Sequence, residues 1–198
     1  MAAGGGCPGS GPGATGPVSQ LIVPPVVGSR LLVTRAEVDA AFERLVAATQ
    51  SLVAVDQCVL LGVLLGGLVP LARLASQLKG DFLLDTCQVA RYGGETRGGI
   101  PRWVAKPRVD LKDRHVVIVD DIHDEGVTLD FLARHCQQAG ARRVTTVVLV
   151  RKRHARPVTG REPDIAGLEV GDEYVFGCGM DYQGHWRHLP EIWGLPAA

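Results

Sequence analysis

The sequence of 198 residues has no excess of charge of either sign, because 21 basic side chains balance 21 acidic ones. Binding to a phosphate backbone or an anionic lipid surface needs a basic surplus, so the balance argues against a general nucleic-acid or membrane-surface binder. Apolar residues make up 46% of the chain and charged residues 21%. These proportions are those of a globular protein and exclude a disordered or collagen-like chain.

Cysteine is scarce and is not arranged in pairs. The five cysteines are odd in number and far apart in the sequence, with no spacing typical of a zinc site or a redox pair. Long apolar runs are also missing: the longest, residues 58–72, is shorter than the ~20 residues of a membrane span and contains Gly66, Gly67 and Pro70. No secretory signal is visible. We therefore expect buried, reduced thiols in a cytoplasmic protein without a membrane segment.

The chain divides into a tail and one domain. Residues 1–19 are rich in glycine, proline and alanine without periodicity, which predicts a disordered tail. The domain is expected over residues 20–198. Thr34 and Glu37 form a capping-box pattern before a run with helical spacing. Further along we expect the following elements: a strand at 57–63, a helix at 68–79, an apolar run at 82–90 and a polar, glycine-rich loop at 91–102.

The clearest pattern begins at residue 115. A strand at 115–119 is followed by a polar turn at 120–127, a helix at 128–138 and a strand at 144–150. Four consecutive apolar residues in the first strand are typical of a parallel strand buried on both faces. The sequence therefore predicts an α/β fold, a doubly wound, mainly parallel sheet flanked by helices. The short, aromatic segment 160–198 is expected to form a small hood lobe with the N-terminal part of the domain.

Four acidic residues crowd the turn after the predicted strand: Asp120, Asp121, Asp124 and Glu125. Ligands of such sheets bind at the carboxyl ends of the strands, and two adjacent carboxylates suit a hydrated Mg²⁺ or sugar hydroxyls. The loop 124–128 leads into a helix N-terminus, which suits a phosphate. The alternative is a plain turn whose acids and Thr128 only cap the helix. Because a cap needs one acid, the crowding favours a site for a cation or for a substrate that carries one.

The stretch 116–129, VVIVDDIHDEGVTL, resembles the phosphoribosyl pyrophosphate-binding motif of the type I phosphoribosyltransferases. His123 stands where an aliphatic residue is common in that motif. The resemblance implies that Asp124 is the general base acting on the purine. It also implies that the phosphoribosyl group and its 5′-phosphate are bound by these residues: Asp120, Asp121, Asp124, Glu125, Gly126, Val127 and Thr128.

Other segments between about residues 58 and 193 resemble the hypoxanthine-guanine (6-oxopurine) branch of that family, in particular a bacterial subgroup. Residues 62–67, GVLLGG, resemble the pyrophosphate loop, with Leu65 and Gly66 as contacts and a non-proline cis peptide expected between residues 64 and 65. Many members carry lysine where Leu65 stands. Arg91 and Tyr92 resemble the start of the mobile loop that closes over the site.

The resemblance extends to the purine-binding and closing segments. It assigns Lys152 to the purine 6-oxygen, with Arg151 and Arg153 as alternatives in the same basic cluster. It assigns the ring of Tyr174 to stacking and the backbone of Val175 to the edge of the base. Asp181 would contact the purine or a second Mg²⁺, and Arg187 would bind pyrophosphate. The implied metal residues are Asp120, Asp121 and Asp181.

The implied function is purine salvage: Mg²⁺-dependent transfer of a phosphoribosyl group from phosphoribosyl pyrophosphate to hypoxanthine or guanine, giving IMP or GMP and pyrophosphate. The resemblance also implies a homodimer or homotetramer, and no nucleic-acid partner is expected. Three alternatives remain at this point. They are a xanthine-specific enzyme, a nucleotide-sensing regulator that keeps this fold and binds RNA through the basic run 142–161, and a paralogue without turnover.

Overall fold

The computed structural model describes residue 1 and residues 25–54, 57–92 and 99–196. The tail expected at 1–19, apart from Met1, and the middle of the predicted mobile loop lie outside these residues. The described elements follow one another along the chain as β1 (Arg30–Val33), α1 (Arg35–Val53), β2 (Cys58–Leu64), α2 (Leu68–Ala75), β3 (Phe82–Tyr92), β4 (Ile100–Ala105), β5 (His115–His123), α3 (Val127–Gln138), β6 (Arg143–Lys152), β7 (Ile165–Val170), β8 (Tyr174–Phe176) and β9 (Ile192–Leu195).

Helix α1 begins where its sequence predicts. The Thr34 side chain accepts a hydrogen bond from the backbone N–H of Glu37, and the Glu37 carboxylate accepts one from the backbone N–H of Thr34 at 2.8 Å. This reciprocal pair satisfies donors that the first turn of a helix leaves without intrahelical partners. The capping box therefore fixes the point at which the chain leaves β1 and enters the long helix.

The main sheet has six strands in the order β4-β3-β2-β5-β6-β7. All neighbouring pairs are parallel except β3 with β4, which is antiparallel. The chain moves outward from β2 to β3 and then returns to place β5 on the other side of β2. The strand order thus reverses between β2 and β5, and in open α/β sheets ligands bind at the carboxyl ends of the strands at such a point. The doubly wound fold predicted from the sequence is confirmed.

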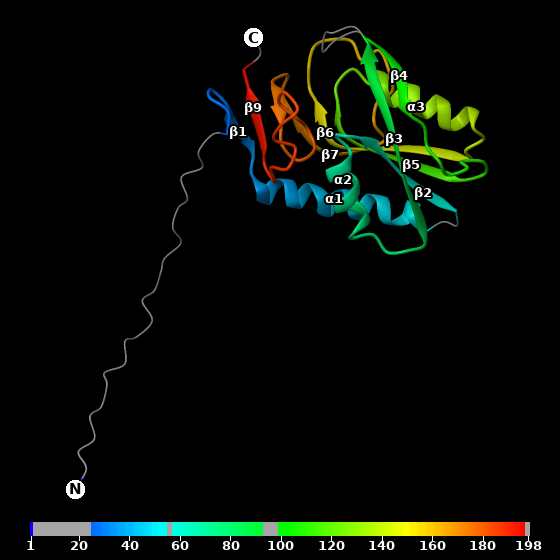
Figure 1. Cartoon of the computed structure of the whole chain (residues 1–198), viewed down its shortest axis with the longest axis horizontal. Helices are drawn as coiled ribbons and strands as arrows, with labels where there is room; N and C mark the ends of the chain where they lie inside the picture. The colour runs from blue at the N-terminus through cyan, green and yellow to red at the C-terminus, as the bar shows by residue number, and fades with distance from the viewer. Residues whose placement is uncertain (2–24, 55–56, 93–98, 197–198) are drawn as a thin grey trace.

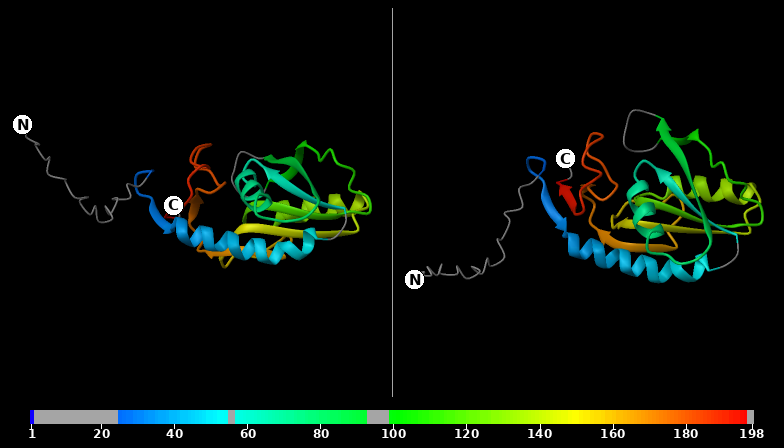
Figure 2. Two further views of the ribbon diagram at one scale, coloured as in Figure 1. Left: turned by 90° about the horizontal axis from the view of Figure 1, so that it is seen from below. Right: turned by 60° about the horizontal axis from the view of Figure 1, so that its bottom comes forward.

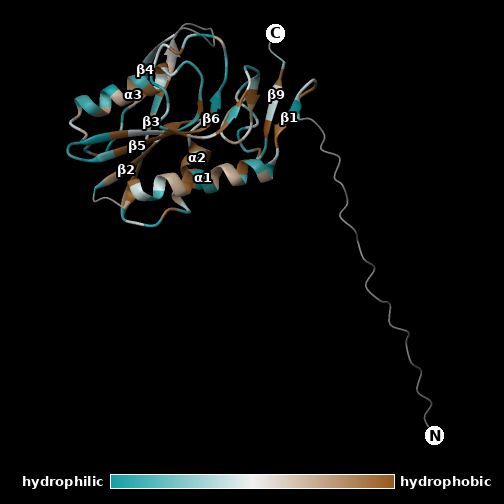
Figure 3. Cartoon of the chain, turned by 180° about the vertical axis from the view of Figure 1, so that it is seen from behind, coloured by the Kyte–Doolittle hydropathy of each residue, from teal (hydrophilic) through white to brown (hydrophobic). Residues whose placement is uncertain are grey.

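Helices cover both faces of the main sheet (Figures 1 and 2). One apolar core lies between the sheet and helices α1 and α2 and includes Phe42, Leu45 and Leu74. A second core lies under α3 and includes Leu132 and Cys136. Figure 3 shows hydrophobic residues along the strands of the main sheet, and hydrophobic residues alternating with hydrophilic ones along the helices. This double burial explains why the central strands β2 and β5 are nearly continuous apolar runs.

A separate three-stranded sheet, in the order β1-β9-β8, forms the small lobe beside the start of α1 (Figure 1). Strand β1 pairs antiparallel with β9, and β9 pairs antiparallel with β8. Strand β7 lies in the segment that the sequence analysis assigned to the hood, yet it pairs with β6 in the main sheet. Within the described residues, no helix is long and apolar enough to cross a membrane.

Several expected boundaries were wrong. The turn expected at 120–127 is shorter, because β5 continues to His123 while its parallel ladder with β6 pairs Asp120 with Val148 and His123 with Arg151. Residues 91–92 and 100–102, which were expected in a loop, belong to the antiparallel pair β3–β4. Helix α2 ends at Ala75 rather than near residue 79.

Candidate active site

Strand β5 delivers two buried carboxylates to its carboxyl end. Asp120 and Asp121 are 7% and 8% exposed. The Asp120 Oδ1 atom accepts a hydrogen bond from the backbone N–H of Asp121 at 2.9 Å, and Asp121 Oδ1 accepts one from that of Ile122 at 2.8 Å. Burial raises the pKa of Asp121. Its hydrogen bonds and the positive charge of Arg187 act in the opposite direction but do not cancel this increase. A cation brought to this carboxylate would favour its ionised form.

The glycine loop after β2 packs directly against these acids. The peptide bond between Leu64 and Leu65 is cis, as the resemblance implied, and the residue Leu65 is 54% exposed. A Cβ atom on Gly66 would lie 1.9 Å from Asp121 Oδ2, and one on Gly179 would lie 2.4 Å from the Gly66 carbonyl oxygen. Side chains at either glycine would separate the loop from the acidic pair. Three segments that are distant in sequence therefore meet at the reversal of the strand order.

The loop after β5 leads into an uncapped helix. Its N-cap residue is Gly126, which has a φ of 77° and no side chain to make a capping hydrogen bond. The N-cap position is thus filled by glycine and not by one of the acids or by Thr128. A hollow of about 280 Å³ lies here, lined by residues of the loop and the end of β5: Asp120, Asp121, Ile122, His123, Asp124, Gly126, Thr128 and Leu129. Backbone N–H groups at a helix N-terminus suit a phosphate.

A backbone segment that the sequence analysis did not single out supports this loop. The N–H of Gly160 donates to the Glu125 carbonyl at 3.0 Å, and the N–H of Arg161 donates to the Gly126 carbonyl at 3.2 Å. A Cβ atom on Gly126 would lie 2.4 Å from the Arg161 carbonyl oxygen. Only glycine therefore fits at Gly126, both for its left-handed φ and for this close approach.

Asp124 lies within reach of three basic side chains. Its Oδ1 atom is 2.7 Å from Nη2 of Arg156 and 2.8 Å from Nε2 of His154, and its Oδ2 atom is 3.9 Å from Nζ of Lys152. These residues come from the end of β6 and the loop after it. The sequence analysis counted His154 and Arg156 only as members of a basic run, since nothing local in the sequence links them to Asp124.

Lys152 differs from its two basic neighbours, Arg151 and Arg153, in its acidic partner. Arg151 pairs with Glu162 at 3.1 Å and with Glu169 at 3.8 Å, and Arg153 also pairs with Glu169. Lys152 instead reaches toward Asp124 and is 13% exposed at its side chain. Of the alternatives left open by the sequence, only Lys152 is therefore brought to the loop after β5.

The small lobe contributes a connected group of polar residues. The hydroxyl of Tyr174, a residue 40% exposed, donates to the Asp181 carbonyl at 2.9 Å. The Asp181 carboxylate lies 2.5 Å from Nη2 of Arg187, and Arg187 Nη1 donates to the Gly179 carbonyl at 2.7 Å. Val175, next to Tyr174, is buried at 6% exposure. The lobe thus places Tyr174, Asp181 and Arg187 together.

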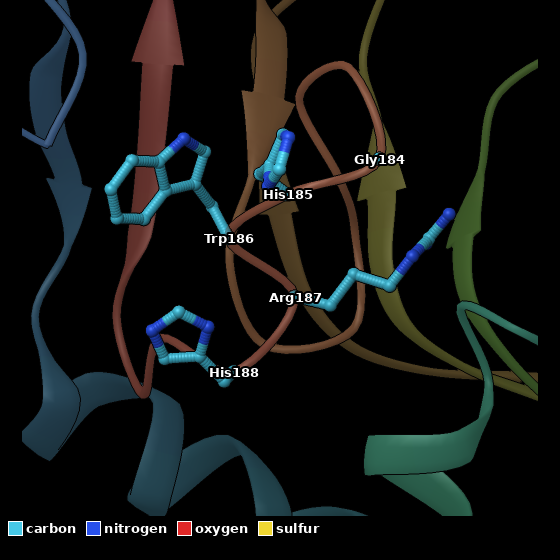
Figure 4. Close-up of a pocket in the computed structure, with 5 residues that line it drawn as sticks. All are labelled: Gly184, His185, Trp186, Arg187 and His188. Carbon is cyan, nitrogen blue, oxygen red and sulfur yellow. The ribbon is translucent and has the colours of Figure 1, made fainter.

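Figure 4 shows the loop that carries Arg187. It surrounds a hollow of about 340 Å³ lined by residues 184–188. Trp186 lies over β9, whereas Arg187 points away from it toward the main sheet (Figure 4). The positive charge of Arg187 acts to lower the pKa of Asp121, as expected of a side chain that points toward the main sheet.

The expected metal residues do not form a ready-made cage. Nowhere in the described residues do three or more histidine, cysteine, aspartate or glutamate side chains gather in a metal-binding arrangement. Asp181 is engaged by Arg187 and by the backbone N–H of Gly184, which donates to its Oδ2 at 2.7 Å. The adjacent carboxylates Asp120 and Asp121 fit a hydrated Mg²⁺, which proteins hold through one or two carboxylates plus substrate oxygens.

The mobile-loop residues Arg91 and Tyr92 are the last two residues of β3. Residues 93–98, and the side chains of Arg91 and Tyr92, lie outside the part of the chain that the structure describes. Their expected role in closing over the site stays a prediction.

Comparisons with known proteins agree with this geometry. Residues 36–183 match the family model of the phosphoribosyl transferase domain. The chain is 30% identical over 164 residues to hypoxanthine-guanine phosphoribosyltransferase of Streptococcus pneumoniae, covering 82% of this chain and 91% of the relative. It is 31% identical over 139 residues to the protein of the same name from Bacillus subtilis, covering 70% of this chain and 77% of the relative.

Solved structures give the same comparison in three dimensions. Hypoxanthine phosphoribosyltransferase of Trypanosoma cruzi, in complex with its product IMP, superposes with a TM-score of 0.74 at 26% identity, covering 83% of this chain and 92% of that one. A hypoxanthine phosphoribosyltransferase of Staphylococcus aureus, at 24% identity, gives a TM-score of 0.78 and covers 84% and 90% of the two chains, which supports the fold.

Proposed function

Because the chain belongs to the phosphoribosyltransferase family, we propose that it is a purine-salvage enzyme that transfers a phosphoribosyl group from phosphoribosyl pyrophosphate to hypoxanthine or guanine. The products are IMP or GMP and pyrophosphate. Curated relatives named hypoxanthine-guanine phosphoribosyltransferase support this choice of base.

The observation that carries the proposal is the pairing of Lys152 with Asp124. The Lys152 ammonium lies 3.9 Å from Oδ2 of Asp124. In a 6-oxopurine, the 6-oxygen and N7 lie side by side on one edge of the ring system. An ammonium beside a carboxylate complements that edge: Lys152 donates to the 6-oxygen while Asp124 accepts the proton from N7. A 6-aminopurine would present a donor to Lys152, so adenine is disfavoured.

The remaining residues serve the phosphoribosyl group. The uncapped start of α3 offers backbone N–H groups to the 5′-phosphate, and Thr128 adds a hydroxyl. Asp120 and Asp121 orient the ribose hydroxyls and the hydrated metal. The glycine loop at Leu65 and Gly66 presents backbone to the pyrophosphate, and Arg187 provides a positive charge as that group departs.

We propose Mg²⁺ as the metal, on the strength of the two hard carboxylate ligands at the end of β5. When bound, it supplies Lewis-acid stabilisation of the charge on pyrophosphate. Asp120 and Asp121 would hold it together with substrate oxygens, and Asp181 would join them once Arg187 turns to the pyrophosphate. Tyr174 stacks on the base, the Val175 backbone meets its edge, and Arg91 and Tyr92 begin the loop that excludes water.

The regulator that binds RNA is not favoured. Such a protein needs a free basic face, and the arginines of the run 142–161 are largely paired with acids. The pairs are Arg151 with Glu162 and Glu169, Arg153 with Glu169, Arg156 with Asp124 and Asp172, and Arg161 with Asp164. We further propose a cytoplasmic location, supported by four buried cysteines that are free thiols: Cys58, Cys87, Cys136 and Cys178. A homodimer or homotetramer is also proposed, on the family resemblance alone.

The test is a turnover assay that follows absorbance. The purified chain is mixed with phosphoribosyl pyrophosphate, Mg²⁺ and, in turn, hypoxanthine, guanine, xanthine or adenine. We expect turnover with hypoxanthine or guanine, loss of turnover with a chelator, and recovery on adding Mg²⁺. Turnover with xanthine alone would replace the proposed base. A folded protein that binds nucleotide but turns over none of the bases would overturn the proposal.

A further inference from the structure

The two carboxylate oxygens of Asp124 have different surroundings. Oδ1 lies near both His154 and Arg156, at 2.8 Å and 2.7 Å, whereas Oδ2 faces Lys152 at 3.9 Å. The hydrogen bond from Arg156 and the close approach of His154 hold one oxygen and leave the other oxygen for a further partner. That second oxygen is the one beside the lysine proposed to read the purine.

His154 is held at both ends of its ring and its side chain is 1% exposed. Its Nε2 atom lies 2.8 Å from Asp124 Oδ1 and 3.2 Å from the Asp124 carbonyl oxygen, and its Nδ1 atom lies 3.2 Å from the Arg156 carbonyl oxygen. A buried ring with an oxygen close to each nitrogen is held in place, whichever nitrogen carries the proton. It therefore fixes both the side chain and the backbone of Asp124 relative to the loop after β6.

Arg156 connects Asp124 to a second part of the site. Its Nη2 atom contacts Asp124 at 2.7 Å, its Nη1 atom forms an ion pair with Asp172, and its Nε atom lies 3.9 Å from Glu125 Oε1. Asp172 belongs to the turn between β7 and β8, two residues before Tyr174. The planar guanidinium can make such contacts at once because its donors are arranged as a rigid fork.

We propose that His154 and Arg156 are positioning residues that hold Asp124 by Oδ1, so that Oδ2 meets the purine N7, and that Arg156 also sets the turn carrying the stacking ring of Tyr174. This inference rests on the proposed function and deepens it. Neither residue touches the base: each acts through Asp124 or through Asp172. A carboxylate that must receive a proton along one direction gains from this constraint, since a misplacement of ~1 Å can cost roughly 100-fold in rate.

The test compares steady-state kinetics of variants with hypoxanthine. His154→Phe removes the ring nitrogen that lies beside Asp124, and His154→Gln keeps an amide nitrogen that can take its place. We expect His154→Phe to lower kcat by roughly 10- to 100-fold with little change in KM for the base. His154→Gln should recover most of the loss. His135→Gln, in the last turn of α3, is the matched control and should leave both constants unchanged.

The pH profile of kcat is a second measurement. It should not change if His154 only stabilises the fold. The charged groups facing Asp124 are Lys152, His154, Arg156 and, through Arg156, Glu125 and Asp172. His154→Phe removes a polar neighbour of the proposed proton acceptor, so the pH profile of kcat should change in that variant. The profile should stay in place in His154→Gln.

The connection to Tyr174 is tested separately. Asp172→Asn weakens the Arg156–Asp172 pair without touching Asp124, and it should raise KM for the base several-fold with kcat nearly unchanged. Arg156→Met should change both constants, whereas Arg134→Met, at an exposed ion pair on α3, should change neither. Circular dichroism verifies that each variant is folded.

The outcomes are distinct. An unchanged kcat and pH profile in His154→Phe, or equal losses in His154→Phe and His154→Gln, would overturn the positioning role of His154. An unchanged KM in both Asp172→Asn and Arg156→Met would overturn the connection to Tyr174. If the wild-type chain shows no turnover, the proposed function fails and this inference fails with it.

Discussion

A Cβ atom on Gly66 would lie 1.9 Å from Oδ2 of Asp121, so the glycine loop after β2 and the acidic pair at the end of β5 are in direct contact. We expect Gly66→Ala to displace the loop or the carboxylate and to lower kcat/KM by about 100-fold, the order of loss caused by a displacement of ~1 Å. Gly171→Ala is the matched control, because a Cβ atom at Gly171 meets nothing within 4 Å. The measurement is the initial rate of each variant. Equal kcat/KM in the two variants would show that the loop accommodates the added methyl group without loss of activity.

Asp124→Asn tests the general base. The amide keeps the shape of the side chain but cannot take a proton from N7, so kcat should fall by about 100- to 10,000-fold. Binding of IMP, measured by calorimetry, should stay close to that of the wild-type chain. Asp130→Asn on α3, whose partner is Arg134 at 2.9 Å, is the control. Unchanged turnover in Asp124→Asn would remove Asp124 as the base.

Metal binding should depend on the substrate. Because the described residues gather no three-ligand cluster, Mg²⁺ alone should bind weakly to the chain. With phosphoribosyl pyrophosphate present, its phosphate and ribose oxygens complete the coordination, so Mg²⁺ should bind far more tightly. Calorimetric titrations of Mg²⁺ with and without phosphoribosyl pyrophosphate measure the difference. Tight binding to the free protein would mean that the chain itself forms the metal site.

Acid should weaken the fold through buried His115. Burial lowers the pKa of His115 below its ordinary value of 6.5, and its Nε2 atom pairs with Thr145 Oγ1 at 2.9 Å. The unfolded chain therefore binds more protons than the folded one as the pH falls below about 6.5, so the free energy of unfolding decreases there and is fully retained at higher pH.

Urea unfolding at several pH values measures this dependence. His115→Gln keeps a polar group near Thr145 but does not titrate, so its stability should fall less steeply than that of the wild-type chain between about pH 6.5 and pH 5. Parallel curves for the two proteins would show that His115 does not contribute to the dependence.

The parts of the fold that were predicted correctly are those encoded locally. The capping box at Thr34 and Glu37 marks the start of α1 within a few residues of sequence. The strand β5 and the helix α3 are likewise encoded locally, although β5 extends to His123, through part of the expected acidic turn. Strand β7 was not predicted as part of the main sheet, since Ile165–Val170 joins that sheet only through its partner β6.

The neighbours of Asp124 could not be predicted for the same reason. His154 and Arg156 follow it by 30 and 32 residues, and only the parallel pairing of β5 with β6 brings them to its carboxylate. A basic run in a sequence does not show which members pair with which acids. The structure separates Lys152, which faces Asp124, from Arg153, which faces Glu169.

The antiparallel pairing of β1 with β9 has a consequence for synthesis of the protein. Every strand of the main sheet lies between Cys58 and Val170, whereas the small sheet needs residues 30–33 together with residues 192–195. A chain emerging from the ribosome, N-terminus first, can therefore assemble the main sheet while β1 still waits for its partner. The nascent chain carries an unpaired strand edge during that interval, and the lobe that bears Tyr174 and Arg187 is completed last.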